Sequence, residues 1–441
     1  MRFFILSFFF TTVVFANMTL EEAWQKVQQN NNGIKASQTD TASAKHKKES
    51  AKSMYLPSVS LIGSYTHMDK PIDIDTSGVA KLMASLPIPL PFPSSVDLSK
   101  QDVFLADLQV LWPLYTGGRI DAAQDIYGAK VDEAKAMLEM KKDKEFLKLV
   151  KTYYGVVVAD ALYKTRQEAY KALELHYENA KKLKEQGQIA NIELLNAKVK
   201  LDAAAIEQTK AQHKYEIALQ AFALLTHSQQ KPLFGMLVSD VKKDQNYYKE
   251  ETTRNYQGLK VFDAKAKQSA SLVKIQKAAY LPSVTGYGNY NLYKDSSPLM
   301  ESLPNWFVGV LVKIDLLQRK DRAQEIQMAK MTQKKVHYLK AEAVENLKLL
   351  VDKTYKEMHS YLQEYNDLDS SLALAQENYK LRTISFKEGL ATSSDVVDAQ
   401  LFLEGVKTKR LNAAYNFLLS LSQLCVLSGE REKFFSFVAH K

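Results

Sequence analysis

The stretch AAYLPSVTGY, from Ala278 to Tyr287, decides the fold because its centre occurs twice in the chain. Ser53 to Leu61 has the sequence SMYLPSVSL, so Tyr-Leu-Pro-Ser-Val is repeated at a distance of 225 residues. Proline lacks the N–H that a continuing helix uses, and it disfavours helical geometry at the residue before it. Pro57 and Pro282 therefore predict a switch from helix to strand at two places.

Three further pairs of segments follow in the same order, which indicates an internal repeat of about 200 residues. They are WPLYTGGRIDAAQDIYGAK and VKIDLLQRKDRAQEIQMAK at 112–130 and 312–330, Lys-Thr-Tyr at 151–153 and 353–355, and EQGQIANIELLNA and KEGLATSSDVVDA at 185–197 and 387–399. The offset falls from 225 to 200, so about 25 extra residues lie between Tyr65 and Ala106 of the first copy. They include the alternating prolines of LPIPLPFPSS at 86–95, for which we expect an extended, solvent-facing loop.

Four segments alternate apolar and polar residues, the pattern of a strand with one wet face. The predicted strands are 57–68 and 103–114 in the first copy and 282–293 and 305–315 in the second. Each has roughly the ten residues that a tilted strand needs to cross a bilayer.

Very long helices are predicted between the strand pairs. Residues 311–388 contain neither Gly nor Pro, and apolar residues recur there every three or four positions. Gly187 and Gly389 fit left-handed helix stops, and Asn191 or Ser393 is the expected N-cap of the helix that returns. Each copy therefore predicts an antiparallel helical hairpin, with its tip at 187 or 389.

Neither part of the repeat is complete in a single chain. The apolar stripe of a hairpin has to be buried against the other hairpin and against further chains. Four strands cannot close a transmembrane barrel, because open edges are not tolerated in lipid. Three chains would supply twelve strands, so we expect a trimer.

The ends and the composition narrow the class of protein. Residues 1–16 have an apolar run after Met1-Arg2 and a small-residue cleavage site, which predicts a signal peptide; a buried N-terminal strand is the alternative. No later stretch is apolar over 18 residues. The formal charge of +9 is interpreted as solvated helix faces, since no basic run is interleaved with aromatic residues as in nucleic-acid binding. The single cysteine, Cys425, is expected in the core.

Motifs of enzymes and cofactor sites are missing from the sequence. The eight histidines are scattered without metal-ligand spacing, and there is no phosphate-binding Gly-x-x-x-x-Gly-Lys loop or Gly-x-Ser-x-Gly elbow. We therefore expect no catalysis, no cofactor and no metal site.

The ordered set of motifs resembles the TolC-like outer-membrane efflux proteins, or outer membrane factors. The resemblance rests on Tyr-Leu-Pro-Ser-Val, on PLYTGGR at 113–119 and on the glycine-containing turns at 187 and 389, and it covers Met18 to about Gly429. It implies a homotrimer in the outer membrane of a Gram-negative bacterium, with a β-barrel that continues into a helical tunnel through the periplasm. A periplasmic adaptor and an inner-membrane pump of RND or ABC type are the implied partners. The second copy departs from the family pattern, with Leu317-Gln318 where Gly117-Gly118 stand in the first.

The resemblance also implies functional residues at the two tips. Asp395 and Asp398 match an inward-facing pair of aspartates near the periplasmic mouth, which would form rings of carboxylates that attract cations. Acidic residues in a first helical turn also favour the helix dipole, so a capping role is the alternative. Gly187, Gln188, Gly389 and Leu390 are expected to contact the adaptor, or to serve only as turns. Ala391 stands where a gating arginine would be expected.

The predicted fold is mainly helical with a small β part, in two copies. The predicted organisation is a signal peptide at 1–16, a first copy at 17–227, a linker at 228–252, a second copy at 253–429 and a tail at 430–441. By resemblance the linker contributes to a belt around the tunnel. The expected function is a passive exit duct for drug efflux or type I secretion, with a non-channel periplasmic or secreted coiled-coil scaffold as the alternative.

Overall fold

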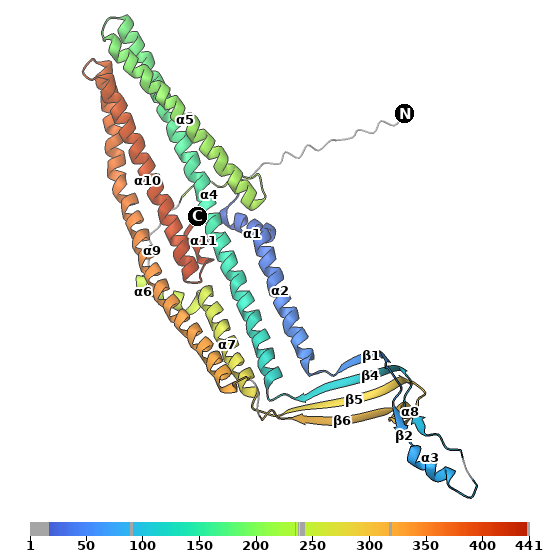
Figure 1. The fold of residues 1–441 in the computed structure, drawn as a ribbon. Coiled ribbons are helices and arrows are strands. Elements are labelled where there is room, and N and C mark those ends of the chain that lie inside the picture. The colour runs from blue at the N-terminus through green and yellow to red at the C-terminus, as the bar shows by residue number, and fades with distance from the viewer. Residues whose placement is uncertain are drawn as a thin grey trace, which may run out of the picture. The chain divides into compact units, whose positions relative to one another are not determined.

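The structure, a computed structural model, describes residues 17–88, 91–233, 235–236, 238, 243–316 and 320–438. The expected signal peptide at 1–16 lies outside these residues. The chain divides into two compact units: Met1–Ala42, Asp132–Asp263 and Tyr338–Lys441 form unit 1, while Ser43–Val131 and Ala264–His337 form unit 2. Most described residues are helical and a small part is in strands (Figure 1), which confirms the predicted fold class.

Unit 2 contains a four-stranded antiparallel sheet. Its strands are β1 (Ser58–His67), β4 (Asp102–Tyr115), β5 (Ser283–Lys294) and β6 (Trp306–Lys313), in the order β1-β4-β5-β6 (Figure 1). All four lie close to the ranges predicted from alternation. The central pairing of β4 with β5 joins the first copy to the second, and β1 and β6 are the two edges of the sheet.

Pro57 and Pro282 lie between a helix and a strand, as predicted. Helix α2 (Asn32–Lys52) tightens into a 3₁₀ turn at Ser53–Tyr55, and Leu56 is extended, with φ −77° and ψ 150°. Helix α7 (Gln257–Ala278) ends before β5 in the same way, since the Leu281 N–H donates to the Ala278 carbonyl at 3.0 Å. Both switches thus break the helix ladder immediately before the proline.

The return from strand to helix requires glycine in the first copy. Gly117 and Gly118 have φ of +65° and +81°, which side chains rarely adopt. A Cβ added to Gly117 would also lie 2.8 Å from the Leu281 Cβ and 3.0 Å from the Ala278 carbonyl oxygen. Leu317 and Gln318, which replace these glycines in the second copy, lie outside the described residues.

The insertion of the first copy has structure that the sequence did not predict. Strands β2 (Asp73–Asp75) and β3 (Ser95–Asp97) pair antiparallel, and in the sequence α3 (Ser77–Ala84), labelled in Figure 1, comes between them. The proline-rich stretch at 86–95 begins after α3, and its end enters β3; residues 89 and 90 lie outside the described part. Elements this short give little periodicity, so alternation could not reveal them.

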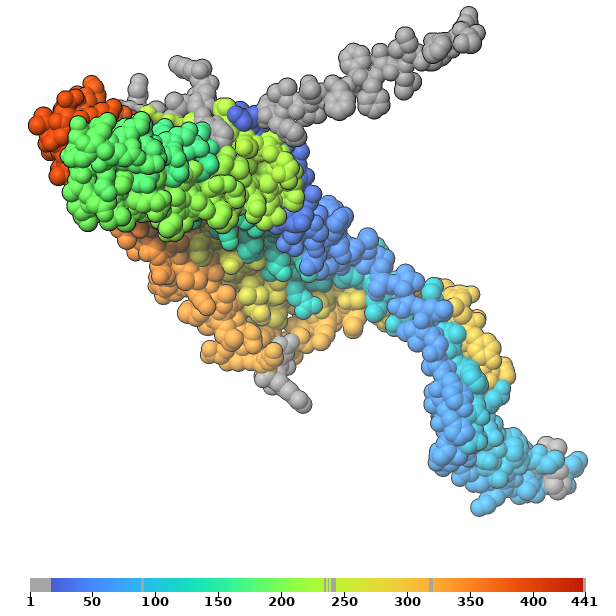
Figure 2. Space-filling view, turned by 90° about the horizontal axis from the view of Figure 1, so that it is seen from above, coloured from blue at the N-terminus to red at the C-terminus, as the bar shows by residue number. Residues whose placement is uncertain are grey.

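Two long hairpins account for most of unit 1. The first consists of α4 (Arg119–Glu185) and α5 (Asn191–Thr226), and the second of α9 (Arg322–Lys387) and α10 (Ser393–Leu427). The first turns of α4 and α9 belong to unit 2. Figure 2 shows the green surface of α4 and α5 beside the orange and red surface of α9 and α10. None of the described helices combines the length and the apolar character needed to cross a membrane.

The shorter helices of unit 1 complete its core. They are α1 (Leu20–Asn30), α6 (Gln245–Asn255) and α11 (Lys433–Val438); a further short helix, α8 (Pro298–Ser302), lies in unit 2. Phe146 of α4 is fully buried and meets Trp24 edge-on at 5.3 Å and Phe434 at 5.8 Å between ring centroids. The tail, for which no role was expected, therefore supplies a core residue, and the expected core position of Cys425 is confirmed at 2% exposure.

Candidate functional site at the helical tips

Both hairpins turn in the same way. Gly187 and Gly389 have φ of +69° and +72°, the left-handed geometry predicted for a helix stop. The Gln188 N–H donates to the Leu183 carbonyl at 2.9 Å, and the Leu390 N–H donates to the Ser385 carbonyl at 2.8 Å. Each pair spans five residues and closes a Schellman motif. The two tips are therefore duplicated in backbone hydrogen bonding as well as in sequence.

The helices that leave the tips begin differently. The N-caps are Ala190 and Thr392, so the predicted caps Asn191 and Ser393 are wrong by one residue. Thr392 forms a complete capping box: its Oγ1 accepts from the Asp395 N–H at 3.2 Å, and its own N–H donates to Asp395 Oδ2 at 2.8 Å. The side chain of Ala190 cannot accept a hydrogen bond, so of the two tips only the second has a capping box.

The carboxylates of Asp395 and Asp398 have different surroundings. Hydrogen bonds from Thr392, together with the charge of Arg382 at 3.9 Å, lower the pKa of Asp395. Asp398 is exposed one helical turn further along α10. The capping role considered for Asp395 is thus present in the structure, and Asp398 is left available for other interactions.

The remaining tip residues lie where turns should be. Gly187 and Gly389 have nothing within 4 Å of an added Cβ, and Leu390 is 82% exposed. Ala391 packs against a small apolar cluster of Ala180, Ala197, Phe386 and Val396. Arg382, in the last turns of α9, is the cation that approaches Asp395.

A buried histidine joins the two hairpins, and sequence reasoning missed it. His176 of α4 is 5% exposed, and its Nε2 lies 2.6 Å from Oγ of Ser393 at the start of α10. The Ser393 N–H in turn donates to Glu193 Oε2 of α5 at 3.1 Å, and the His176 ring lies 4.5 Å from that of Phe386 of α9. All four long helices meet at this point. Scattered histidines give no sequence signal, because only the fold brings 176 and 393 together.

Further along the hairpins, ion pairs connect α4 with α10. Arg166 pairs with Glu404, which is 4% exposed, and Lys407 Nζ lies 2.8 Å from Glu168 Oε2. Burial raises the pKa of Glu404, and the charge of Arg166 opposes that rise. Removing Arg166 would leave the buried carboxylate of Glu404 uncompensated.

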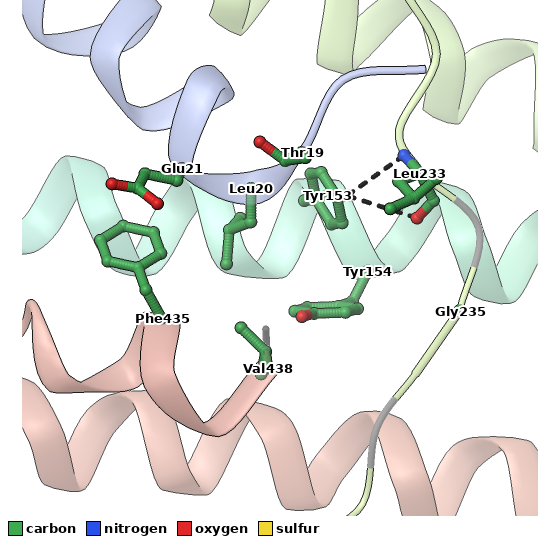
Figure 3. A pocket seen from close by; sticks show the side chains of 9 residues that line it. All are labelled: Thr19, Leu20, Glu21, Tyr153, Tyr154, Leu233, Gly235, Phe435 and Val438. Carbon is green, nitrogen blue, oxygen red and sulfur yellow. Dashed lines mark hydrogen bonds between the residues drawn. The ribbon is translucent and has the colours of Figure 1, made fainter. Parts of the chain in front are cut away.

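A cavity of about 290 Å³ lies at the other end of α5 and α10, between α1, α4 and α11 (Figure 3). Tyr153 and Tyr154 line it, and the Tyr153 hydroxyl accepts from the Leu233 N–H and donates to the Met18 carbonyl, both at 3.1 Å. Burial raises the pKa of Tyr153 to about 12, so the phenol stays neutral. These bonds fix the linker beside α1. Across the described part of the chain, no cluster of His, Cys, Asp or Glu could hold a metal ion.

Comparison with known proteins gives a family and a fold. The family model described as outer membrane efflux protein matches residues 23–226 and 250–430. No curated protein sequence matches the chain. Among solved structures, the Campylobacter jejuni CmeC outer membrane channel is 15% identical, with a TM-score of 0.72 over 95% of this chain and 87% of that one. The outer membrane protein VceC from Vibrio cholerae is 14% identical, with a TM-score of 0.73 over 93% and 96%.

A third similar structure, the open state of the Neisseria gonorrhoeae MtrE outer membrane channel, is 15% identical, with a TM-score of 0.72 over 93% of this chain and 89% of that one. At such identities these likenesses show a shared fold. The family model is the stronger finding, because it covers both copies of the repeat. The chain therefore belongs to the outer membrane efflux protein family and is an outer-membrane efflux channel.

Proposed function

We propose that three copies of this chain form the passive exit duct of a tripartite efflux or type I secretion system. The single observation that carries the proposal is the open, apolar sheet of unit 2. Val59 and Leu61 of β1 are 61% and 69% exposed, and Val308 and Val310 of β6 are 75% and 63% exposed. β6 is apolar at nearly every position from Trp306 to Val312, and exposed apolar side chains on both edge strands fit a lipid-facing surface.

The edges of the sheet favour closure with further copies. Among the described strands, β1 and β6 each pair with one neighbour only. Because an unpaired edge is not tolerated in lipid, β6 of one copy would pair with β1 of the next, and three copies would give twelve strands. The helices would then extend into the periplasm as a tunnel. The family membership supports this channel over the coiled-coil scaffold, and it supports transport rather than catalysis.

The tips supply the proposed contacts with an adaptor, which an inner-membrane pump of RND or ABC type would accompany. Leu390 is 82% exposed at the turn of the second tip, and Gln188 is its counterpart in the first copy. Gly187 and Gly389 would permit the turns that present them. Leu390→Asp should abolish co-purification with the cognate adaptor while the trimer stays intact. Retained co-purification would remove Leu390 from the interface.

Cysteine cross-linking tests the trimer. Cys425 is the single cysteine and is buried, so a Cys425→Ser background gives a chain without thiols. In that background, Leu61→Cys on β1 and Val312→Cys on β6 place both thiols on the same face of the sheet. Together they should give covalent trimers in membranes, and each single variant should give none. The same protein should conduct ions in a planar bilayer. Monomers without conductance would overturn the proposed function.

A further inference from the structure

The helix segments that adjoin the sheet are strongly basic. These segments are 43–52 of α2, 119–131 of α4, 264–278 of α7 and 322–337 of α9, all in unit 2. They contain four carboxylates and fourteen basic residues, which we name the basic collar: Lys45, Lys47, Lys48, Lys52, Arg119, Lys130, Lys265, Lys267, Lys274, Lys277, Arg322, Lys330, Lys334 and Lys335. Their formal charge of +10 exceeds the +9 of the whole chain.

The excess of basic over acidic residues is confined to these segments. Beyond the collar, residues 132–185 of α4 and 338–387 of α9 together contain nineteen basic and eighteen acidic residues. At the opposite end of the sheet, the insertion at 68–101 contains four aspartates and three lysines. A solvated helix face would not require such a difference between two parts of one helix. The position of the collar therefore needs a separate explanation.

The collar lies immediately beside the strands. Lys52 precedes β1 by six residues, Lys277 precedes β5 by six, and Arg119 follows β4 by four. The longest segment would extend about 24 Å at 1.5 Å per residue. All fourteen side chains are exposed except that of Arg322, which is half-buried and donates to the carbonyls of Ala279 and Asp315. Thirteen exposed cationic side chains thus lie at one end of the sheet. Lys52 pairs with Glu49 and Lys274 with Asp125, so what the surroundings meet is the excess of positive over negative charge.

We propose that the basic collar binds the headgroups of anionic phospholipids in the leaflet that faces the helices. This rests on the proposed function, in which the sheet is the membrane-spanning part. Lysines and arginines close to a membrane segment are attracted by an anionic surface, within a Debye length of about 8 Å. Long lysine side chains also reach along the surface of a protein to place the ammonium group at the interface.

Lipid is favoured over an anionic polymer of the cell wall because the excess positive charge does not continue along the helices beyond the basic collar. A polymer that surrounds the helices would interact along their length. The balanced charge of 132–185 and 338–387 gives no net attraction for an anionic polymer. Only the helix segments that adjoin the strands are basic, so the excess positive charge lies in the part of the chain nearest the membrane.

The test uses full-length protein in nanodiscs of phosphatidylcholine with and without phosphatidylglycerol. In the collar variant, Lys45, Lys47, Lys48 and Lys277 are replaced by Gln; in the matched control, Lys171, Lys181, Lys200 and Lys214 are replaced by Gln, all exposed in unit 1. Native mass spectrometry should show preferential retention of phosphatidylglycerol by the wild type and the control, and at least a tenfold loss of that preference in the collar variant.

Three results would overturn the proposal. The first is equal retention by the collar variant and the control. The second is that soluble anionic cell-wall fragments, added to the same nanodiscs, are retained while phosphatidylglycerol is not preferred. The third is changed ion selectivity in the collar variant with unchanged lipid retention, which would place the lysines in the pore. Bilayer conductance of the wild type reports on the proposed function separately. A conducting channel without lipid preference would therefore refute only the proposal that the basic collar binds lipid.

Discussion

His176 Nε2 and Ser393 Oγ lie 2.6 Å apart although 217 residues separate them in the chain. This contact connects the long helix of the first hairpin with the first turn of the last helix of the second. Glu193 and Phe386 complete the surroundings from the other two helices. His176 thus places a titratable group at a junction of four helices, which predicts that the tips respond to protonation.

We expect the tips to lose stability as the pH falls below about 6.5. Burial lowers the pKa of His176 from its ordinary value of 6.5, and the charge of Glu193 only partly opposes this. The unfolded chain therefore binds a proton before the folded chain does, so the contribution of His176 is complete above pH 6.5 and declines below it. Hydrogen exchange at the tips should accelerate between pH 7.5 and pH 5.5 beyond the intrinsic pH effect.

His176→Gln should remove this pH dependence, because glutamine keeps a hydrogen-bonding group but does not titrate. His213→Gln is the matched control, since His213 is exposed on α5. An unchanged acceleration of exchange in the His176 variant would disprove the role of His176 in this pH dependence.

The two N-caps predict opposite effects of substitution. Thr392→Ala removes a capping box and should destabilise the second tip by about 0.5–2 kcal/mol. Ala190→Thr adds a side chain that can cap at the equivalent place and should stabilise the first tip by up to about 1 kcal/mol. Local hydrogen exchange at each tip measures both changes. Equal destabilisation by both substitutions would contradict the assigned caps.

The proposed aspartate rings can be separated from the cap. Asp395 is engaged by Thr392, whereas Asp398 is exposed. Asp398→Asn should therefore weaken block of the channel by divalent and trivalent cations without loss of stability. Asp395→Asn should weaken the block and also lower the stability of the second tip. Conductance in planar bilayers with and without added cations measures the block. Block that is unchanged in both variants would exclude the rings.

The tail should matter for stability. Phe434 is fully buried against Phe146, and Phe→Ala in a core costs about 3–5 kcal/mol. Phe437→Ala, at a half-buried position on the same helix, should cost clearly less and serves as the control. Thermal unfolding followed by circular dichroism would show the difference. Equal midpoints of thermal unfolding for Phe434→Ala and the wild type would show that the packing of α11 does not contribute to stability.

Much of the fold could be predicted because its elements are long or repeated. The strands follow alternation, and the two prolines mark where helices stop, so Pro57 and Pro282 were identified from local chemistry alone. Gly187 and Gly389 were predictable for the same reason. The N-caps were placed one residue late. Asn191 is a better cap by residue type than Ala190, and Ser393 and Thr392 cannot be told apart by residue type.

The parts that escaped prediction depend on contacts between distant residues. Nothing local distinguishes His176 from the other histidines, or pairs Arg166 with Glu404. The role of Phe434 was equally hidden, because a six-residue helix has too few turns to show a periodic face. Alternative interpretations of Asp395 also could not be separated until its bonds to Thr392 were visible.

The pairing of β4 with β5 has a consequence for biogenesis. In the proposed ring of six repeats, three of the seams are internal to a polypeptide and close without regard to protein concentration. The other three, between β6 and β1, form only when separate chains meet, so ring closure becomes slower as the protein is diluted. Until then every newly exported chain carries two bare strand edges, which recruit other strands indiscriminately. Escort by a chaperone would be most valuable during that interval.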